Sequence, residues 1–205
     1  MDVFVVFVLL AGVLHFFKSR EQAERVALLG SYLGKFQIEK LMLDVFAGYD
    51  RALNETDTDR QVQVWRYLEP QEKTLAEQFG RFVLEFAEVY EARARVSRLP
   101  LALPFLSLAV PAATFDLRKL MGVHGDGIAR AVANPKGFEP KRRAFAIMAE
   151  LMLMQHSCHW FCRSKLVASA RLLARHQTAY AQVLDAVAQP TRRAYLVVVG
   201  RGTGQ

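Results

Sequence analysis

The pattern of apolar and polar positions sets the first segment of the chain apart from everything that follows. Residues 3–17, VFVVFVLLAGVLHFF, carry no charged side chain, and Lys18 and Arg20 come directly after them. As an α-helix, at about 1.5 Å per residue, this run spans roughly 22 Å, less than the roughly 30 Å hydrocarbon core unless flanking side chains snorkel. It has neither the basic start nor the A-x-A site of a signal peptide. We therefore predict a transmembrane anchor over residues 1–20, ahead of a buried helix or a cleaved leader.

The cations after this segment predict the orientation of the anchor. Lys18, Arg20 and Arg25 all lie on its carboxyl side, which the positive-inside rule places in the cytosol. The two cysteines, Cys158 and Cys162, share one helical stretch instead of spreading over loops, which suits a reducing compartment. We expect a protein of the inner (cytoplasmic) membrane with the bulk of the chain in the cytosol.

Helical spacing dominates residues 21–98, which we predict to be an acidic helical stalk or hairpin. Apolar residues recur on one helix face between Ile38 and Leu53, as expected for a stalk that continues from the anchor. Residues 54–59, NETDTD, predict a polar loop that caps a short helix. A second helix is predicted to have Pro70 in its first turn. Its apolar stripe comprises Leu75, Phe79, Phe82, Phe86 and Tyr90.

Proline and glycine interrupt residues 99–140, which we predict to be an apolar connection. Residues 99–115 are uncharged, but they include three prolines, which remove backbone hydrogen bonds that lipid cannot replace. Two interpretations stay open: a buried irregular connection, and a segment that dips into or crosses the bilayer. Residues 125–127, GDG, predict a turn.

Charge divides the chain into two unlike halves. Residues 1–92 carry 10 Lys and Arg against 15 Asp and Glu, whereas residues 93–205 carry 17 against 5, within a net charge of +7. The halves either pack together as complementary faces, or the basic half meets an anionic partner. We predict a basic helical region over residues 141–205, with a helix from Ala144 to about Val187 and a short strand at residues 195–199. The predicted fold class is mainly α: a transmembrane helix followed by a helical bundle-like domain.

The stretch HSCHWFC, residues 156–162, concentrates side chains that bind metals. On a helix, Cys158, His159 and Cys162 share one side and are the candidate ligands for a thiophilic ion. Consecutive turns of one helix rarely converge on one tetrahedral ion, and the spacing matches neither C-x-x-C nor the C-x-x-C-H of haem attachment. We expect packed side chains and no metal or cofactor, with a helical metal- or haem-binding protein as the alternative.

The sequence shows no complete catalytic constellation. A thiol nucleophile beside His156 or His159 would lack an orienting carboxylate nearby. The ending YLVVVGRGTGQ is similar to a strand that enters a phosphate loop, but the helix whose amino terminus would hold the phosphate is missing. We therefore predict no catalytic residues and a protein that is not an enzyme.

A spaced set of residues near the carboxyl end carries a likeness to a known family. The set follows Arg98-x-Pro100 and comprises His156, Ala170, Arg171, Pro190, Arg192, Arg193, Tyr195, Val199, Gly200 and Arg201. It resembles the carboxyl-terminal cytosolic region of a membrane-anchored coupling-complex subunit of type IVB secretion and related conjugation systems. This chain is shorter and lacks the tryptophans expected around the arginine pair. The resemblance implies a scaffold, without enzymatic activity, whose basic cytosolic surface receives acidic cargo signals.

Anchor, charge and resemblance together predict a membrane-anchored interaction or scaffold subunit of a bacterial envelope complex, in secretion or conjugation. The expected partners are other subunits of the membrane complex, the membrane itself through the anchor, and an anionic lipid or acidic protein ahead of nucleic acid. A basic protein that binds nucleic acid or anionic lipid is the alternative, and nucleic-acid binding would weaken steeply with salt. The cations expected to contact a partner are Arg142, Arg143, Arg163, Lys165, Arg171, Arg175, Arg192 and Arg193.

Overall fold

The computed structural model describes residues 3–102, 104 and 110–200, and this part of the chain is mainly α-helical, as predicted. Arg201 and the rest of the glycine-rich ending, together with part of the proline-containing segment, lie outside the described residues. The elements in chain order are α1 (Val3–Leu33), α2 (Ile38–Asn54), α3 (Thr58–Ala87), α4 (Glu91–Ala94), β1 (Arg95–Ser97), the 3-10 helix η1 (Pro111–Ala113), β2 (Thr114–Asp116), α6 (Leu117–Ala133), α7 (Pro140–Cys162), α8 (Lys165–His176), α9 (Tyr180–Ala186) and α10 (Gln189–Gly200).

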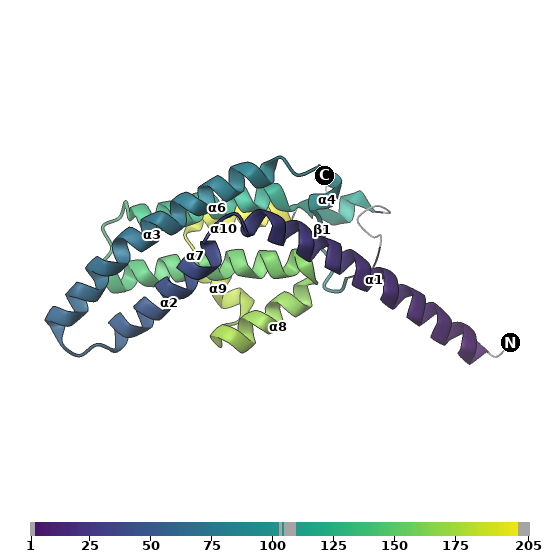
Figure 1. Ribbon diagram of the computed structural model, residues 1–205, viewed down its shortest axis with the longest axis horizontal. Helices are drawn as coiled ribbons and strands as arrows, with labels where there is room; N and C mark the ends of the chain where they lie inside the picture. Colours follow the sequence, from purple (N-terminus) through teal and green to yellow (C-terminus); the bar gives the residue numbers. More distant parts are fainter. Residues whose placement is uncertain (1–2, 103, 105–109, 201–205) are drawn as a thin grey trace.

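The helices form a body from which α1 projects as a single rod (Figure 1). Helices α2 and α3 form an antiparallel hairpin, and α3 packs against α6. Helix α7 runs through the body and contacts α6, α8, α9, α1 and α2. In the view of Figure 1, α6 and α10 lie above α7, whereas α8 and α9 lie below it. Strands β1 and β2 pair antiparallel, with Val96 opposite Phe115.

Helix α1 is long and apolar enough to cross a membrane, in agreement with the predicted anchor. Every residue from 3 to 17 is exposed, so the helical body covers none of the apolar run. The helix continues to Leu33, and Leu28 and Leu29 near its end are buried in the body. The predicted continuous stalk is wrong, because a turn over residues 34–37 separates α1 from α2.

Helix α3 is a single helix of 30 residues, and Pro70 lies inside it instead of in its first turn. The side chain of Asp57 caps its amino end by accepting from the backbone N–H groups of Asp59 and Arg60. The predicted apolar stripe is confirmed for its first four members, Leu75, Phe79, Phe82 and Phe86, which are fully buried. Its last member, Tyr90, is 74% exposed, because α3 ends at Ala87 before the stripe reaches it.

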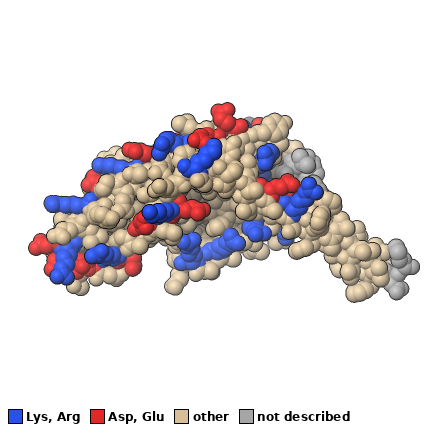
Figure 2. All heavy atoms as spheres, in the orientation of Figure 1, with Lys and Arg blue, Asp and Glu red and all other residues tan. Residues whose placement is uncertain are grey.

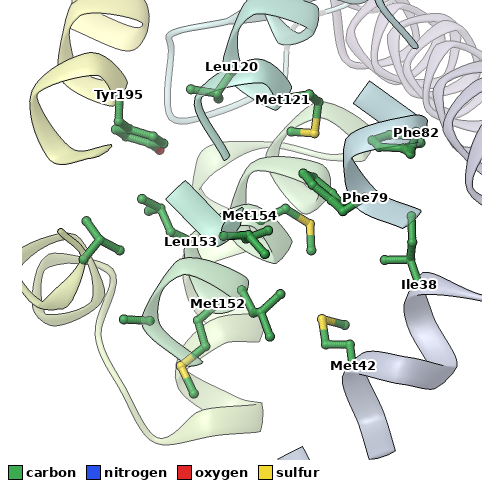
Figure 3. Packing of buried hydrophobic residues seen from close by; sticks show 14 of the residues in the cluster. Ile38, Met42, Phe79, Phe82, Leu120, Met121, Met152, Leu153, Met154 and Tyr195 are labelled. Atoms are coloured by element: carbon green, nitrogen blue, oxygen red, sulfur yellow. The ribbon is translucent and has the colours of Figure 1, made fainter. Parts of the chain in front are cut away.

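Helix α7 lies at the centre of the hydrophobic core. Its consecutive residues 149–154 are all buried, as expected for a helix surrounded by other helices rather than lying on a surface. Figure 3 shows Leu153 and Met154 of α7 among side chains from four other helices. These neighbours are Ile38 and Met42 of α2, Phe79 and Phe82 of α3, Leu120 and Met121 of α6, and Tyr195 of α10.

Two local predictions are wrong, and packing explains both. The GDG at residues 125–127 lies inside α6, where Gly127 is buried against α7 and α10, so it is a point of close helix approach instead of a turn. Residues 195–199, predicted as a strand, belong to α10. The β-branched valines favour a strand, but burial of Tyr195 in the core holds the segment helical.

The acidic and basic halves of the chain pack against each other. Helix α3 of the acidic half lies along α6 of the basic half. Ion pairs across this division join Glu72 to Arg143 and Glu91 to Arg118. Complementary packing therefore accounts for part of the charge asymmetry, and the cations that it leaves without a carboxylate partner are the ones available to a ligand.

Candidate functional site

A sharp turn after α7 brings two basic helices side by side. The chain leaves the helix at Arg163, and the hydroxyl of Ser164 caps α8 by accepting from the backbone N–H of Val167 at 3.3 Å. Helix α8 then packs against α7. The prediction of one helix from Ala144 to about Val187 is therefore wrong. Because the chain turns here, side chains from α7 and α8 can face the same space.

A hollow of about 400 Å³ lies between α7 and α8. We call it the α7–α8 hollow and define it by its lining residues, which are Gln155, His156, His159, Arg171, Leu172, Ala174, Arg175 and His176. Among the residues that the structure describes, no aspartate or glutamate lines it. Figure 2 shows Lys and Arg side chains gathered over α8, along the lower edge of the molecule in that view.

The two arginines are exposed and lie on successive turns of α8. Arg171 donates from Nη1 to Nδ1 of His159 at 3.3 Å, which requires a neutral His159 with its proton on Nε2. Burial, together with the guanidinium groups of Arg171 and Arg175, lowers the pKa of His159. In the described part of the chain neither arginine forms an ion pair with a carboxylate.

The other histidines of the hollow are held by polar contacts at its walls. His176 donates from Nε2 to the side-chain oxygen of Gln155 at 3.1 Å. Burial lowers the pKa of His176, and Arg175 lowers it further. His156 lies deeper, with its ring stacked on Tyr180 and Nε2 at 3.1 Å from Oγ of Ser169.

An adjoining hollow of about 210 Å³ extends this surface toward α2. It shares Gln155, His159 and Arg175 with the α7–α8 hollow, and Glu39 of α2 also lines it. One acidic side chain and Arg175 therefore line the same adjoining hollow. A ligand that spans both hollows would find its positive wall at α8.

This arrangement suits the binding of an anion. Two guanidinium groups that form no ion pair within the described part of the chain present fixed donor pairs that match a carboxylate or phosphate. The imidazole of His159 accepts from Arg171, and an anion close to both would stabilise the protonated form of His159. Donors of this kind bind and orient a ligand.

The cysteines of the HSCHWFC stretch are packed side chains. Burial raises the pKa of the Cys162 thiol to about 11 and raises that of Cys158 well above its usual value, which leaves both thiols protonated and unreactive at neutral pH. Sγ of Cys158 lies 3.7 Å from Sδ of Met154. Within the described residues, no group of three or more His, Cys, Asp and Glu side chains could hold a metal ion.

The structure divides the eight cations that the sequence singled out for partner contact. Arg171 and Arg175 come together in the α7–α8 hollow. Three others are engaged elsewhere: Arg143 in a buried ion pair with Glu72, Arg192 with Asp185 at 2.8 Å, and Lys165 over the rings of Trp160 and Tyr180. Arg163 contacts Gln22 of α1, Arg142 lies over the ring of Phe138, and Arg193 is exposed on α10.

A separate hollow of about 390 Å³ between α6 and α7 was missed from the sequence. Arg130, Lys136, Arg142 and the exposed ring of Phe145 line it, and the buried Glu150 lies at its wall. One oxygen of Glu150 accepts from the backbone N–H of Ala188 at 3.1 Å, and the other lies close to where a Cβ on Gly127 would be. The lone glutamate in an apolar helix was the available signal, and it marks a helix junction here.

Comparisons with known proteins identify no relative of this chain. No family model matches it, and neither curated proteins nor solved structures give a significant match.

Proposed function

We propose that this protein is a membrane-anchored interaction subunit, without enzymatic activity, that binds carboxylate groups of an acidic partner in the α7–α8 hollow. The observation that carries the proposal is the pair Arg171 and Arg175, which are exposed in a hollow that also contains His159 and have no carboxylate partner among the residues that the structure describes. Helix α1 would fix this hollow near the cytosolic face of the membrane. The partner would carry glutamate or aspartate side chains.

The biological setting follows from the resemblance described above. A scaffold of a secretion or conjugation complex at the inner membrane has to receive cargo in the cytosol, and acidic signals would meet a cationic hollow there. Arg171, Arg192 and Arg193 belong to the set of residues that carries the resemblance, although Arg192 is paired with Asp185. Arg171 and His156 are thus the residues that link the resemblance to the site.

The test is the binding of a fluorescent glutamate-rich peptide to the full-length protein in detergent, followed by anisotropy. Charge-assisted hydrogen bonds contribute about 1.5 kcal/mol or more, so we expect Arg171→Gln and Arg175→Gln each to weaken binding about tenfold. The matched control is Arg66→Gln, which removes one exposed charge from α3, far along the chain from the hollow.

Two results would contradict the proposal. Equal losses in Arg66→Gln and Arg171→Gln would show that the peptide responds to net charge and not to the hollow. Preference for duplex DNA over the peptide, with affinity that falls steeply as salt rises, would favour nucleic-acid binding instead.

A further inference from the structure

The junction between α1 and the helical body has features of a second contact with the membrane. The depth of this junction in the membrane follows from the length of the apolar run in α1. The uncharged run of residues 3–17 spans roughly 22 Å, less than the hydrocarbon core of roughly 30 Å, so the cation that follows it is drawn to the boundary of that core. Lys18 therefore marks the depth at which headgroups begin.

Two hydrogen bonds hold the body at that depth. Arg163 donates from Nη1 to the side-chain oxygen of Gln22 at 2.7 Å, and Arg25 donates from Nη1 to the backbone oxygen of Phe161 at 3.1 Å. Gln22 is four residues beyond Lys18, which is about 6 Å along the helix. The headgroup region adds roughly 5–8 Å on each side of the core, so Arg163 lies within it.

Apolar side chains are exposed beside this junction. Leu101 is 56% exposed and Leu166 is 57% exposed, with Leu99 and Val167 next to them. The backbone N–H of Leu166 donates to the carbonyl of Pro100 at 3.1 Å, which holds the two segments together. A cluster of exposed leucines around cations is typical of a surface that lies in a membrane interface.

A shallow cleft between these segments combines both kinds of side chain. Its lining includes Lys18 and Arg163 together with Leu99, Leu101 and Trp160. Arg25 also lines it and is paired there with Glu21 at 2.6 Å, so Lys18 and Arg163 are the cations offered to a phosphate. The ring nitrogen of Trp160 donates to the backbone oxygen of Ser97 at 2.9 Å and so fixes the floor of the cleft. The phosphate group of a phospholipid binds cations, and its acyl chains contact apolar surface. The cleft offers cations and apolar side chains at the same depth.

We propose that this surface, formed by residues 99–101 and the start of α8, rests in the headgroup layer of the cytosolic leaflet and binds anionic phospholipid through Lys18 and Arg163. The inference rests on the membrane anchoring in the proposed function and adds a second contact to it. With α1 alone, the anchor could tilt in the bilayer and so turn a different side of the attached body toward it. A second contact fixes which side of the body faces the bilayer and thus where the α7–α8 hollow opens.

The test is photocrosslinking to lipid. A benzophenone-bearing phenylalanine analogue replaces Leu101 or Leu166 in the full-length chain, which is reconstituted into phosphatidylcholine vesicles that contain phosphatidylglycerol. Adducts are identified by mass spectrometry after irradiation. The same analogue at Leu14 of the anchor is the positive control, and at Leu84, an exposed leucine of α3, the negative control. We expect lipid adducts at positions 14, 101 and 166 and none at position 84.

The lipid preference is tested by charge removal in the chain that carries the analogue at position 101. Each cation near an anionic surface contributes about 1 kcal/mol, so Arg163→Gln is expected to lower the ratio of phosphatidylglycerol to phosphatidylcholine adducts about fivefold. Arg51→Gln, which removes an exposed charge from α2, is the matched control and leaves the ratio unchanged.

The outcomes separate this inference from the proposed function. Adducts at position 14 without adducts at positions 101 and 166, or adducts to a second copy of the chain at those positions, overturn the second contact and leave the anchor in place. An absence of adducts at position 14 overturns the anchor itself. Equal ratios in the Arg163 and Arg51 variants overturn the selectivity for anionic lipid.

Discussion

Arginine side chains have different surroundings in the interior of the helical body and in the α7–α8 hollow. In the interior, Arg143 pairs with Glu72, which also accepts from the hydroxyl of Tyr49 at 2.7 Å. In the hollow, Arg171 and Arg175 form no ion pair with any carboxylate of the described residues. The comparison shows that the number of arginines in a basic region does not measure its binding surface, because some of those cations already neutralise buried acids.

The largest expected effect comes from breaking the interior pair. Arg143→Met leaves the carboxylate of Glu72 buried without its cation, which costs about 3 kcal/mol of unfolding free energy. Arg171→Met, at the exposed hollow, is expected to change stability by less than about 0.5 kcal/mol. Urea unfolding in detergent, followed by circular dichroism, measures both.

A double variant sharpens this contrast. Replacing both partners, Glu72→Leu with Arg143→Met, removes the buried charges together and is expected to recover much of the lost stability. If Arg143→Met were as stable as Arg171→Met, the ion pair would contribute nothing to the fold, and Arg143 would return to the set of cations available to a partner.

The second effect is a loss of stability in acid that originates in the interior histidines. His124 is fully buried, and its Nε2 lies 2.9 Å from Oγ of Ser157, whose hydroxyl donates to the backbone oxygen of Leu153. Burial and His156 lower the pKa of His124 to about 3, and burial, Lys165 and His159 lower that of His156 to about 3. Both values lie below the usual 6.5 of an unfolded chain.

The lowered pKa values determine how stability changes with pH. The native state favours neutral rings, so their contribution is complete above pH 6.5 and is lost as the pH falls from about 6.5 toward 3, by about 2 kcal/mol for each histidine at pH 5. His124→Gln keeps a donor without titrating and should remove about half of this dependence in urea unfolding measured at several pH values. The control is His176→Gln, at the rim of the hollow. A pH profile that is identical in wild type and His124→Gln would refute the assignment.

The third effect tests the close helix approach at Gly127. A Cβ there would meet Oε2 of Glu150 and lie 2.9 Å from Oγ1 of Thr191, so Gly127→Ala displaces the buried carboxylate that accepts from the backbone N–H of Ala188 and is expected to cost about 2 kcal/mol. Gly122→Ala in the same helix meets nothing within 4 Å and should be neutral or stabilising by up to about 1 kcal/mol. Thermal unfolding of the two variants decides between a packing requirement and a general effect of alanine in α6.

Gly127 also illustrates which parts of the fold could be read from the sequence. The apolar run of α1 and the stripe from Leu75 to Phe86 have signals that are local in the chain, and both were predicted. The role of Gly127 depends on side chains more than 20 positions away, and a GDG viewed locally favours a turn. Likewise, the valines of α10 favour a strand until the burial of Tyr195 is known.

The candidate site could also be predicted only in part from the sequence. Arg171 and Arg175, four positions apart, lie on one helix face, and both were in the predicted set of partner-binding cations. Their approach to His159 was not predictable, because it depends on the turn at Ser164, where periodicity favoured an unbroken helix. The engagement of Arg143 with Glu72 was hidden for a similar reason, since the partners are 71 residues apart.

The smallest expected effect concerns proton uptake in the hollow when an acidic ligand binds. In the free protein, burial and two guanidinium groups lower the pKa of His159, and its Nδ1 accepts from Arg171. A carboxylate bound between the arginines supplies a nearby negative charge and raises that pKa, so binding takes up part of a proton. Affinity for the glutamate-rich peptide should therefore rise as the pH falls from 7.5 to 5.5, by a free energy on the order of 1 kcal/mol, while the peptide stays ionised. His159→Gln should flatten this rise in an anisotropy titration, whereas His176→Gln, whose ring donates to Gln155, should keep most of it. The opposite sign, with affinity that falls in acid, would place the bound carboxylates away from His159 and so outside the hollow.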